Sequence, residues 1–214
     1  MRRLAAAILL GLVLSLWADA EPAGPRGTLL YSRLTDGVWQ IWQRELAGGA
    51  PRQLTFSSGD KRYPAWGTDG RITYCTSNQD CYQVQPGADP QPLLTELWPV
   101  KDLVWSPDGA RLAFARFRVE LADSANLWIV EADEGGRRML THDPGIQYNP
   151  AWSPDGTRLA YAAGHGHGTY EIYVVHADGT GRRQLTENQA HEFLPAWSPD
   201  GRRLAFVSDR SGDF

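Results

Sequence analysis

The amino-acid sequence predicts an all-β protein, a β-propeller made of four-stranded antiparallel blades. The composition is the first indication: the 214 residues include 22 Gly, 14 Pro and nine Trp but only two Met. Such a chain favours short strands and tight turns over long helices. The second indication is a sequence unit that recurs four times, at a period typical of propeller blades. The third is the alternation of large and small residues in each unit, which is typical of strands.

Each unit contains a tryptophan followed by a turn motif. The four copies are Ala65–Gly70, Val104–Gly109, Ala151–Gly156 and Ala196–Gly201, with tryptophans 39, 47 and 45 residues apart. In the Ser-Pro-Asp-Gly form, Ser suits the first turn position, Pro presets φ at the second, and Gly takes the left-handed conformation that closes a hairpin. The first copy lacks the Pro. Each copy therefore predicts a strand, a turn and a second strand.

The segment after the turn is apolar on both faces. Its copies are Leu112–Ala115, Leu159–Ala162 and Leu204–Val207, and the first unit has Arg71–Cys75 in their place. Large residues alternate with small ones, so they lie on opposite faces of a strand. Because both faces are apolar, we expect neighbouring sheets to cover both.

A second motif ends each unit. Thr55, Thr95, Thr141 and Thr186 each follow a Leu, and an aromatic residue stands thirteen places ahead of each: Trp42, Tyr82, Trp128 and Tyr173. This spacing fits an aromatic strand, a turn and an outer strand. Four strands in a unit of about 40 to 45 residues is the propeller-blade pattern, whereas a helical solenoid would need a 3.6-residue period.

The predicted strands make four to five blade units. Residues 27–55 supply three strands, Leu29–Ser32, Val38–Glu45 and Arg52–Thr55; three full units follow, and the last copy has two strands before Ser208–Phe214. The total is seventeen strands, with an incomplete last blade. We expect part of a larger propeller; the alternative is closure as four blades, with the Val38–Thr55 strands pairing with the final unit.

The first twenty residues have the pattern of a cleavable signal peptide. Arg2 and Arg3 precede the apolar run Leu4–Trp17, and Ala18-Asp19-Ala20 supplies a small-x-small cleavage site. A membrane anchor is the alternative, although the 14-residue apolar run is shorter than a bilayer span. The expected organisation is a signal peptide at 1–20, a linker at 21–26 and propeller repeats at 27–214.

Cys75 and Cys81 are the only cysteines, and an exported protein can form a disulfide. The segment Ser77–Asp80 between them has the composition of a hairpin turn, so the two residues can face each other across paired strands at a bridgeable distance. We expect a disulfide; two small core residues are the alternative.

Charge and motifs argue against several function classes. The net charge of −4 is unfavourable for nucleic-acid binding, which needs a basic face. The chain has no Gly-x-Ser-x-Gly elbow, His-Glu-x-x-His pair or phosphate-binding glycine loop. The two histidines within Gly164–Gly168 suit either a flexible hairpin or two ligands of a transition metal. Asp108, Asp155 and Asp200 are turn formers. We therefore predict no catalytic residue, cofactor or metal.

A binding surface is expected on the rim that carries the connections between units and the middle hairpins. Arg62, Lys101, Tyr148 and Phe193 each stand four residues before a unit tryptophan, so they occupy equivalent places near the channel mouth. Trp98 lies in one of the connections. Aromatic and basic residues there suit an acidic or extended partner. The alternative is that each aromatic residue packs its loop onto the blade beneath.

The repeats resemble the blades of TolB-type propellers over residues 27–214. The resemblance rests on Pro150–Gly156, Pro195–Gly201, Arg203–Phe206 and Arg183–Thr186. It implies a six-bladed propeller, a periplasmic location, and a non-catalytic scaffold that binds a protein or cell-envelope partner such as a peptidoglycan-associated lipoprotein. TolB-type proteins carry an α/β domain ahead of the propeller, whereas here the repeats are expected directly after the signal peptide.

Two enzyme classes share such propellers and stay open as alternatives. One is the gating propeller of a prolyl-oligopeptidase-like peptidase, with its catalytic domain beyond residue 214. The other is a propeller-type polysaccharide lyase, which needs metal-binding histidines and a catalytic base in the channel. Sequence encoded downstream of residue 214 would distinguish these classes.

The signal-peptide assignment makes a direct prediction. When the chain is expressed in a Gram-negative host, cleavage after Ala20 should leave Glu21 as the first residue of periplasmic material. N-terminal sequencing of the exported protein checks this, and recovery of Met1 from the periplasm would refute it.

Overall fold

The computed structural model describes residues 27–77, 80–94, 100–118, 124–132, 136–164 and 168–212. These residues form seventeen strands joined by turns and connections. Within them there is no helix long and apolar enough to cross a bilayer. The predicted signal peptide and linker, residues 1–26, lie outside the described part of the chain.

The strands group into units that follow the sequence repeats. The first unit contains β1 (Thr28–Thr35), β2 (Val38–Glu45) and β3 (Arg52–Gln53). The second contains β4 (Lys61–Trp66), β5 (Ile72–Thr76), β6 (Cys81–Val84) and β7 (Gln91–Leu94). The third contains β8 (Val100–Trp105), β9 (Arg111–Phe117), β10 (Ala125–Glu131) and β11 (Arg137–Met139). The fourth contains β12 (Ile146–Trp152), β13 (Arg158–Gly164), β14 (Tyr170–His176) and β15 (Arg183–Gln184), and the last contains β16 (Glu192–Trp197) and β17 (Leu204–Ser208).

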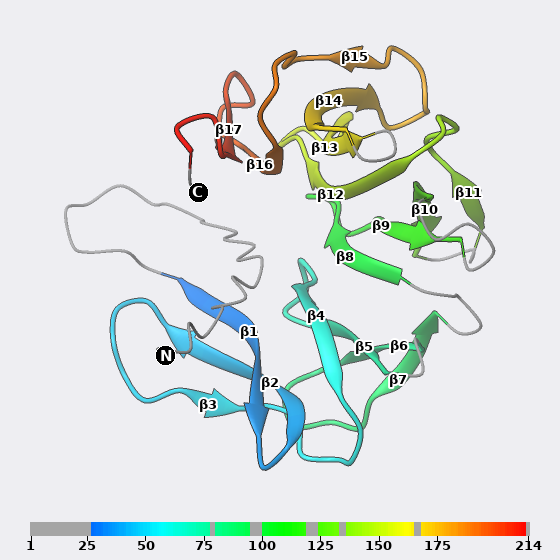
Figure 1. Cartoon of the computed structure of the whole chain (residues 1–214). Coiled ribbons are helices and arrows are strands. Elements are labelled where there is room, and N and C mark those ends of the chain that lie inside the picture. The colour runs from blue at the N-terminus through cyan, green and yellow to red at the C-terminus, as the bar shows by residue number, and fades with distance from the viewer. Residues whose placement is uncertain are drawn as a thin grey trace.

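The units follow one another around a common centre, with the first strand of each full unit toward the middle (Figure 1). Successive innermost strands contact each other, from β4 through β8 and β12 to β16, and β4 also contacts β1, which is equivalent to the second strand of a full unit. Within a unit the ladders are antiparallel, and a single parallel pair, Ala125 with Ile146, joins the third unit to the fourth. The all-β propeller fold predicted from the repeats is confirmed. In the described residues β2 and β3 pair within their own sheet, not with β16 and β17.

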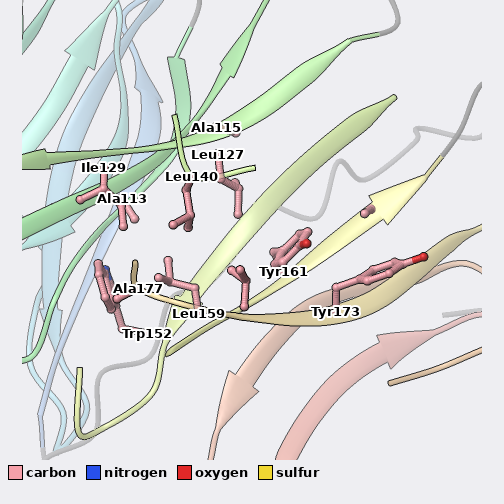
Figure 2. Close-up of a cluster of buried hydrophobic side chains, with 12 residues drawn as sticks. Ala113, Ala115, Leu127, Ile129, Leu140, Trp152, Leu159, Tyr161, Tyr173 and Ala177 are labelled. Atoms are coloured by element: carbon pink, nitrogen blue, oxygen red, sulfur yellow. The ribbon is translucent and has the colours of Figure 1, made fainter. Parts of the chain in front are cut away.

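The hydrophobic core lies between units, and the second strand of a unit serves two interfaces. In β9, Leu112 and Phe114 pack toward the second unit, whereas Ala113 and Ala115 pack toward the fourth. Figure 2 shows the latter interface, where these alanines lie opposite the larger side chains of the following unit, including Tyr161. The small face of β9, with Leu127 and Ile129 beside it on β10, thus accommodates the larger side chains of the next unit. This is the burial of both faces that the alternating pattern predicts.

The unit tryptophans join each sheet to the one before it. The indole N–H of Trp105 donates to Thr73 Oγ1 at 2.9 Å, and Trp152 and Trp197 donate to the carbonyls of Val104 and Ala151, both at 3.1 Å. On the other side, the Arg111 guanidinium lies 4.8 Å from the Trp152 ring centroid. Trp152 therefore has both its ring face and its N–H in contact with the preceding unit, and Trp197, over Arg158, repeats this arrangement.

The repeated polar residues stabilise turns and strand ends. The Ser153 hydroxyl donates to the Asp155 carboxylate, and this bond, with those from Thr157, lowers the pKa of Asp155 to about 2. Asp108 and Asp200 make the same contact with Ser106 and Ser198. Their geometry is that of turn formers. The hydroxyls of Thr55, Thr141 and Thr186 accept the backbone N–H of Ile41, Leu127 and Ile172 at 2.8 to 3.0 Å, which explains the Leu-Thr motif.

Cys75 and Cys81 face each other at the end of the β5–β6 hairpin. They are paired in the antiparallel register, their Cα atoms are 4.0 Å apart, and a disulfide joins them. Both side chains are buried in the core between the second and third units. The two cysteines are therefore core residues and also form a disulfide, so the two alternatives hold together.

Three polar clusters occupy equivalent places on the connection-bearing rim, where the innermost strand of one unit meets the next-to-last strand of the unit before it (β2, β10 or β14). In one, Asn126 Nδ2 donates to Gln147 Oε1 at 2.7 Å. In another, the Lys61 ammonium donates to the carbonyls of Ser57, Ser58 and Gly59. The third has two carboxylates, Glu171 and Glu192, and each keeps a buried Oε2 without a partner in the described part of the chain. The Oε1 atoms are satisfied: that of Glu171 accepts the backbone N–H of Asn188, and that of Glu192 accepts Asn188 Nδ2, Ser208 and Arg210. Neither carboxylate can donate to the other, however, whereas Asn126 donates to Gln147.

Replacing one of these carboxylates should therefore stabilise the protein. Glu171→Gln introduces an amide at the place where Asn126 donates to Gln147, and we expect the free energy of unfolding to rise by about 1–2 kcal/mol at neutral pH. Asn126→Asp is the matched control and should lower it, because it removes the donor from a satisfied pair. Thermal and urea unfolding measure both. A less stable Glu171→Gln protein would mean that the two carboxylates are already satisfied.

Candidate functional site

Each innermost strand from β4 to β16 contains the same β-bulge. In β4 the register shifts between Arg62 and Ala65, so that two residues oppose one on β5, and the same shift occurs in β8, β12 and β16. The first bulge residue has a left-handed backbone in every copy: Tyr63 (φ 55°), Asp102 (φ 56°), Asn149 (φ 52°) and Leu194 (φ 51°). Four non-glycine residues with positive φ in equivalent places form a repeated feature of the fold.

Proline accounts for much of this geometry. Pro64, Pro150 and Pro195 follow the left-handed residues in three of the copies. Proline cannot donate to a ladder, so inside a sheet it is confined to edges and bulges. It also disfavours the right-handed α region for the residue before it. The bulge thus accommodates the proline, and the strand continues beyond it to the unit tryptophan. The bulge also changes the direction of the side chain of the left-handed residue before the proline.

The four residues predicted for the binding rim all lie immediately before the bulge. Arg62, Lys101, Tyr148 and Phe193 pair with equivalent positions of β5, β9, β13 and β17. Their surroundings divide them into two pairs. The Arg62 guanidinium lies 4.6 Å from the Trp39 ring centroid and 3.4 Å from the Asp60 carboxylate. Lys101 Nζ lies 4.7 Å from the Phe117 ring centroid.

Tyr148 and Phe193 belong instead to one aromatic cluster, which we define as Tyr148, Tyr170, His191 and Phe193. The ring centroids of Tyr148 and Phe193 are 5.9 Å apart, and both rings contact Tyr170, at 5.1 and 5.2 Å respectively. His191 stacks on Phe193 at 5.8 Å. All four side chains are half-buried. The cluster joins the fourth unit to the last, and part of each ring is accessible at the rim.

A carboxylate lies beside this cluster, and the sequence patterns did not identify it. Asp102 Oδ2 accepts the backbone N–H and the side-chain amide of Asn149, both at 3.0 Å, across the interface between the third and fourth units. Burial raises the pKa of Asp102, against the effect of these hydrogen bonds and of Lys101. Burial also raises the pKa of Tyr63 and of Tyr148, and the Asp102 charge adds to both shifts. The prolines inside the innermost strands were the available signal for the bulge that brings these groups together.

Several predicted features fall on residues outside the described part of the chain. These are Trp98, Thr95 and both histidines of the Gly164–Gly168 loop. Among the residues that the structure describes, no group of three or more His, Cys, Asp or Glu side chains is placed to hold a metal ion.

Comparison with known proteins identifies the repeats. The family described as "TolB beta propeller domain" matches residues 83–214, more than half of the chain. The Tol-Pal system protein TolB of Anaeromyxobacter dehalogenans is 36% identical over 120 residues. That match covers 53% of this chain and 26% of the relative, so the chain corresponds to about a quarter of that protein.

Solved structures give the same fold. The putative TolB of Agrobacterium tumefaciens superposes with a TM-score of 0.67 and 26% identity, over 76% of this chain and 59% of that one. An oligogalacturonate lyase from Vibrio parahaemolyticus (TM-score 0.65, 19% identity, 85% and 55% coverage) shares the fold. So does a puromycin-hydrolyzing peptidase from Mycobacterium tuberculosis (0.62, 20%, 86% and 34%). At these identities the last two likenesses concern the fold alone.

Proposed function

Because this chain belongs to the TolB β-propeller domain family, we propose that it is a non-catalytic scaffold that binds a protein of the cell envelope. The proposed location is the periplasm, reached through the signal peptide expected at residues 1–20. The proposed partner is a peptidoglycan-associated lipoprotein, since the matched relative is named a Tol-Pal system protein. Family membership alone does not assign a function, so the proposal also needs a site.

The observation that supports binding is the aromatic cluster of Tyr148, Tyr170, His191 and Phe193. Half-buried aromatic rings grouped at one place are typical of the residues that dominate the energy of protein interfaces. The ring contacts within the cluster limit the rotamers of each side chain, so little conformational entropy remains to be lost when a partner packs on them. The cluster also stands at the junction of two units, where one extended segment can contact both.

The two rim cations support the proposal in a different way. Arg62 and Lys101 are exposed and lie on equivalent places of two other units. Their contacts with Trp39 and Phe117 leave the charges accessible to solvent. Exposed rim charges mainly affect the rate of association and its salt dependence, whereas central aromatics determine the dissociation rate. We therefore assign affinity to the aromatic cluster and steering to the cations.

Truncation of the cluster tests the proposal. Phe193→Ala should weaken binding of the soluble domain of the organism's own peptidoglycan-associated lipoprotein by about 1–3 kcal/mol, roughly a 5- to 150-fold rise in Kd. Isothermal titration calorimetry of the purified proteins measures the change. Leu185→Ala is the control, because Leu185 is 40% exposed and follows the outer strand β15, away from the cluster.

Thermal unfolding of each variant separates binding from packing. An aromatic residue that only holds its loop in place would lower the melting temperature without a specific loss of affinity. A folded Phe193→Ala protein with the affinity of the unmodified chain would contradict the assignment of binding to this cluster.

A further inference from the structure

We propose that Asp102, with Tyr63 and Tyr148 beside it, forms a subsite for a cationic group carried by the bound segment of the partner. The class of ligand is a lysine or arginine side chain or a terminal amine. This inference rests on the proposed function, because it assigns a chemical specificity to the same face of the propeller.

The Asp102 carboxylate is held by the protein through only one of its two oxygens. Both hydrogen bonds from Asn149 go to Oδ2, and Oδ1 has no hydrogen-bond partner among the residues that the structure describes. The left-handed backbone of Asp102 and that of Asn149 bring the two side chains together from equivalent bulges of neighbouring units. Oδ2 is thus fixed by the protein, and Oδ1 keeps its capacity to accept a hydrogen bond, which is the arrangement of a preorganised acceptor.

The negative charge of Asp102 also favours a cationic ligand. Asp102 forms no ion pair in the described part of the chain: Arg62 pairs with Asp60, and the Lys101 ammonium lies over Phe117. A half-buried carboxylate without a direct ion pair is electrostatically unfavourable, and burial raises the pKa of Asp102 although the nearby Lys101 charge acts to lower it. A cation bound at Oδ1 would reverse this cost, because it stabilises the charged form.

Two tyrosines, Tyr63 and Tyr148, lie near the Asp102 carboxylate. Both phenols are within electrostatic reach of the carboxylate, since its charge contributes to raising the pKa of Tyr63 and of Tyr148. Tyr148 also belongs to the aromatic cluster proposed to bind the partner. Aromatic faces attract ammonium and guanidinium groups through the ring quadrupole. With these two tyrosines near it, the Asp102 carboxylate should prefer an organic cation to a neutral side chain of the same length.

The test uses two short peptides and the full-length chain. The probes are acetyl-Gly-Lys-Gly-amide and its norleucine analogue, which has the same carbon chain without the charge. Nitrogen–proton NMR spectra follow the backbone and side-chain amide signals of Asn149. We expect the lysine peptide to shift both signals in a saturable way, with a Kd at least five-fold lower than that of the norleucine peptide.

Asp102→Asn should remove the preference for lysine, because it keeps the acceptor for the Asn149 N–H and removes the charge. Asp36→Asn is the matched control: Asp36 is also a left-handed aspartate (φ 51°), in the exposed turn between β1 and β2, and its replacement should change nothing. Equal Kd values for the two peptides, or a lysine preference that survives Asp102→Asn, would overturn the proposal.

The unmodified chain provides a second measurement that does not depend on the folding of a variant. The folded-state pKa of Asp102 is raised, so the carboxylate is charged only above that value. The lysine preference should weaken as the pH falls, and at a higher pH than it would for an ordinary aspartate. A preference that is constant down to the ordinary aspartate range would also refute the subsite.

This outcome is separable from that of the partner experiment. If the lipoprotein domain does not bind but the lysine peptide behaves as described, the subsite stands and the partner is a different one. If the lipoprotein binds through Phe193 and the two peptides are indistinguishable, the proposed function stands and the subsite is wrong.

Discussion

The packing of each sheet's apolar face on the apolar face of the next sheet is the constraint on which the structure depends. Each unit is apolar on both sides, so an isolated unit would leave both strand faces in water. The contact between Ala113 and Ala115 on one side and Tyr161 and its neighbours on the other shows how the alternation in sequence becomes an interface. The tryptophan N–H bonds add direction to this packing, because each indole reaches a fixed acceptor in the preceding unit.

The same packing explains why the binding features lie where they do. The faces of the sheets are occupied by neighbouring units, so only the rims and the innermost strands remain for a ligand. The first residue of the bulge differs from unit to unit: it is Tyr63, Asp102, Asn149 or Leu194. The strand ladder beyond the bulge is the same in all four. A repeated backbone device therefore presents a different side chain from each unit.

Sequence reasoning predicted those parts of the fold that repeat locally. The Ser-Pro-Asp-Gly turns, the alternating strand over Leu112–Ala115 and the Leu-Thr motif each have a short-range cause, and the structure contains them. The rim residues were predicted to occupy equivalent positions. Whether each lies over its own aromatic ring, as Arg62 and Lys101 do, or shares a cluster, as Tyr148 and Phe193 do, depends on neighbours that are distant in sequence. The Asp102–Asn149 contact joins residues 47 apart, and no local pattern specifies it. There is a second reason why this contact could not be predicted: the two side chains face each other only because of the bulge.

The central claim is that each tryptophan couples its unit to the preceding one. Amide hydrogen exchange of Trp152→Phe, which keeps an aromatic ring but removes the N–H that Val104 accepts, tests it most directly. The account predicts lower protection in β8 and β9 of the third unit as well as in β12 and β13 of the fourth. Loss of protection confined to the fourth unit, with β8 and β9 as protected as before, would contradict it.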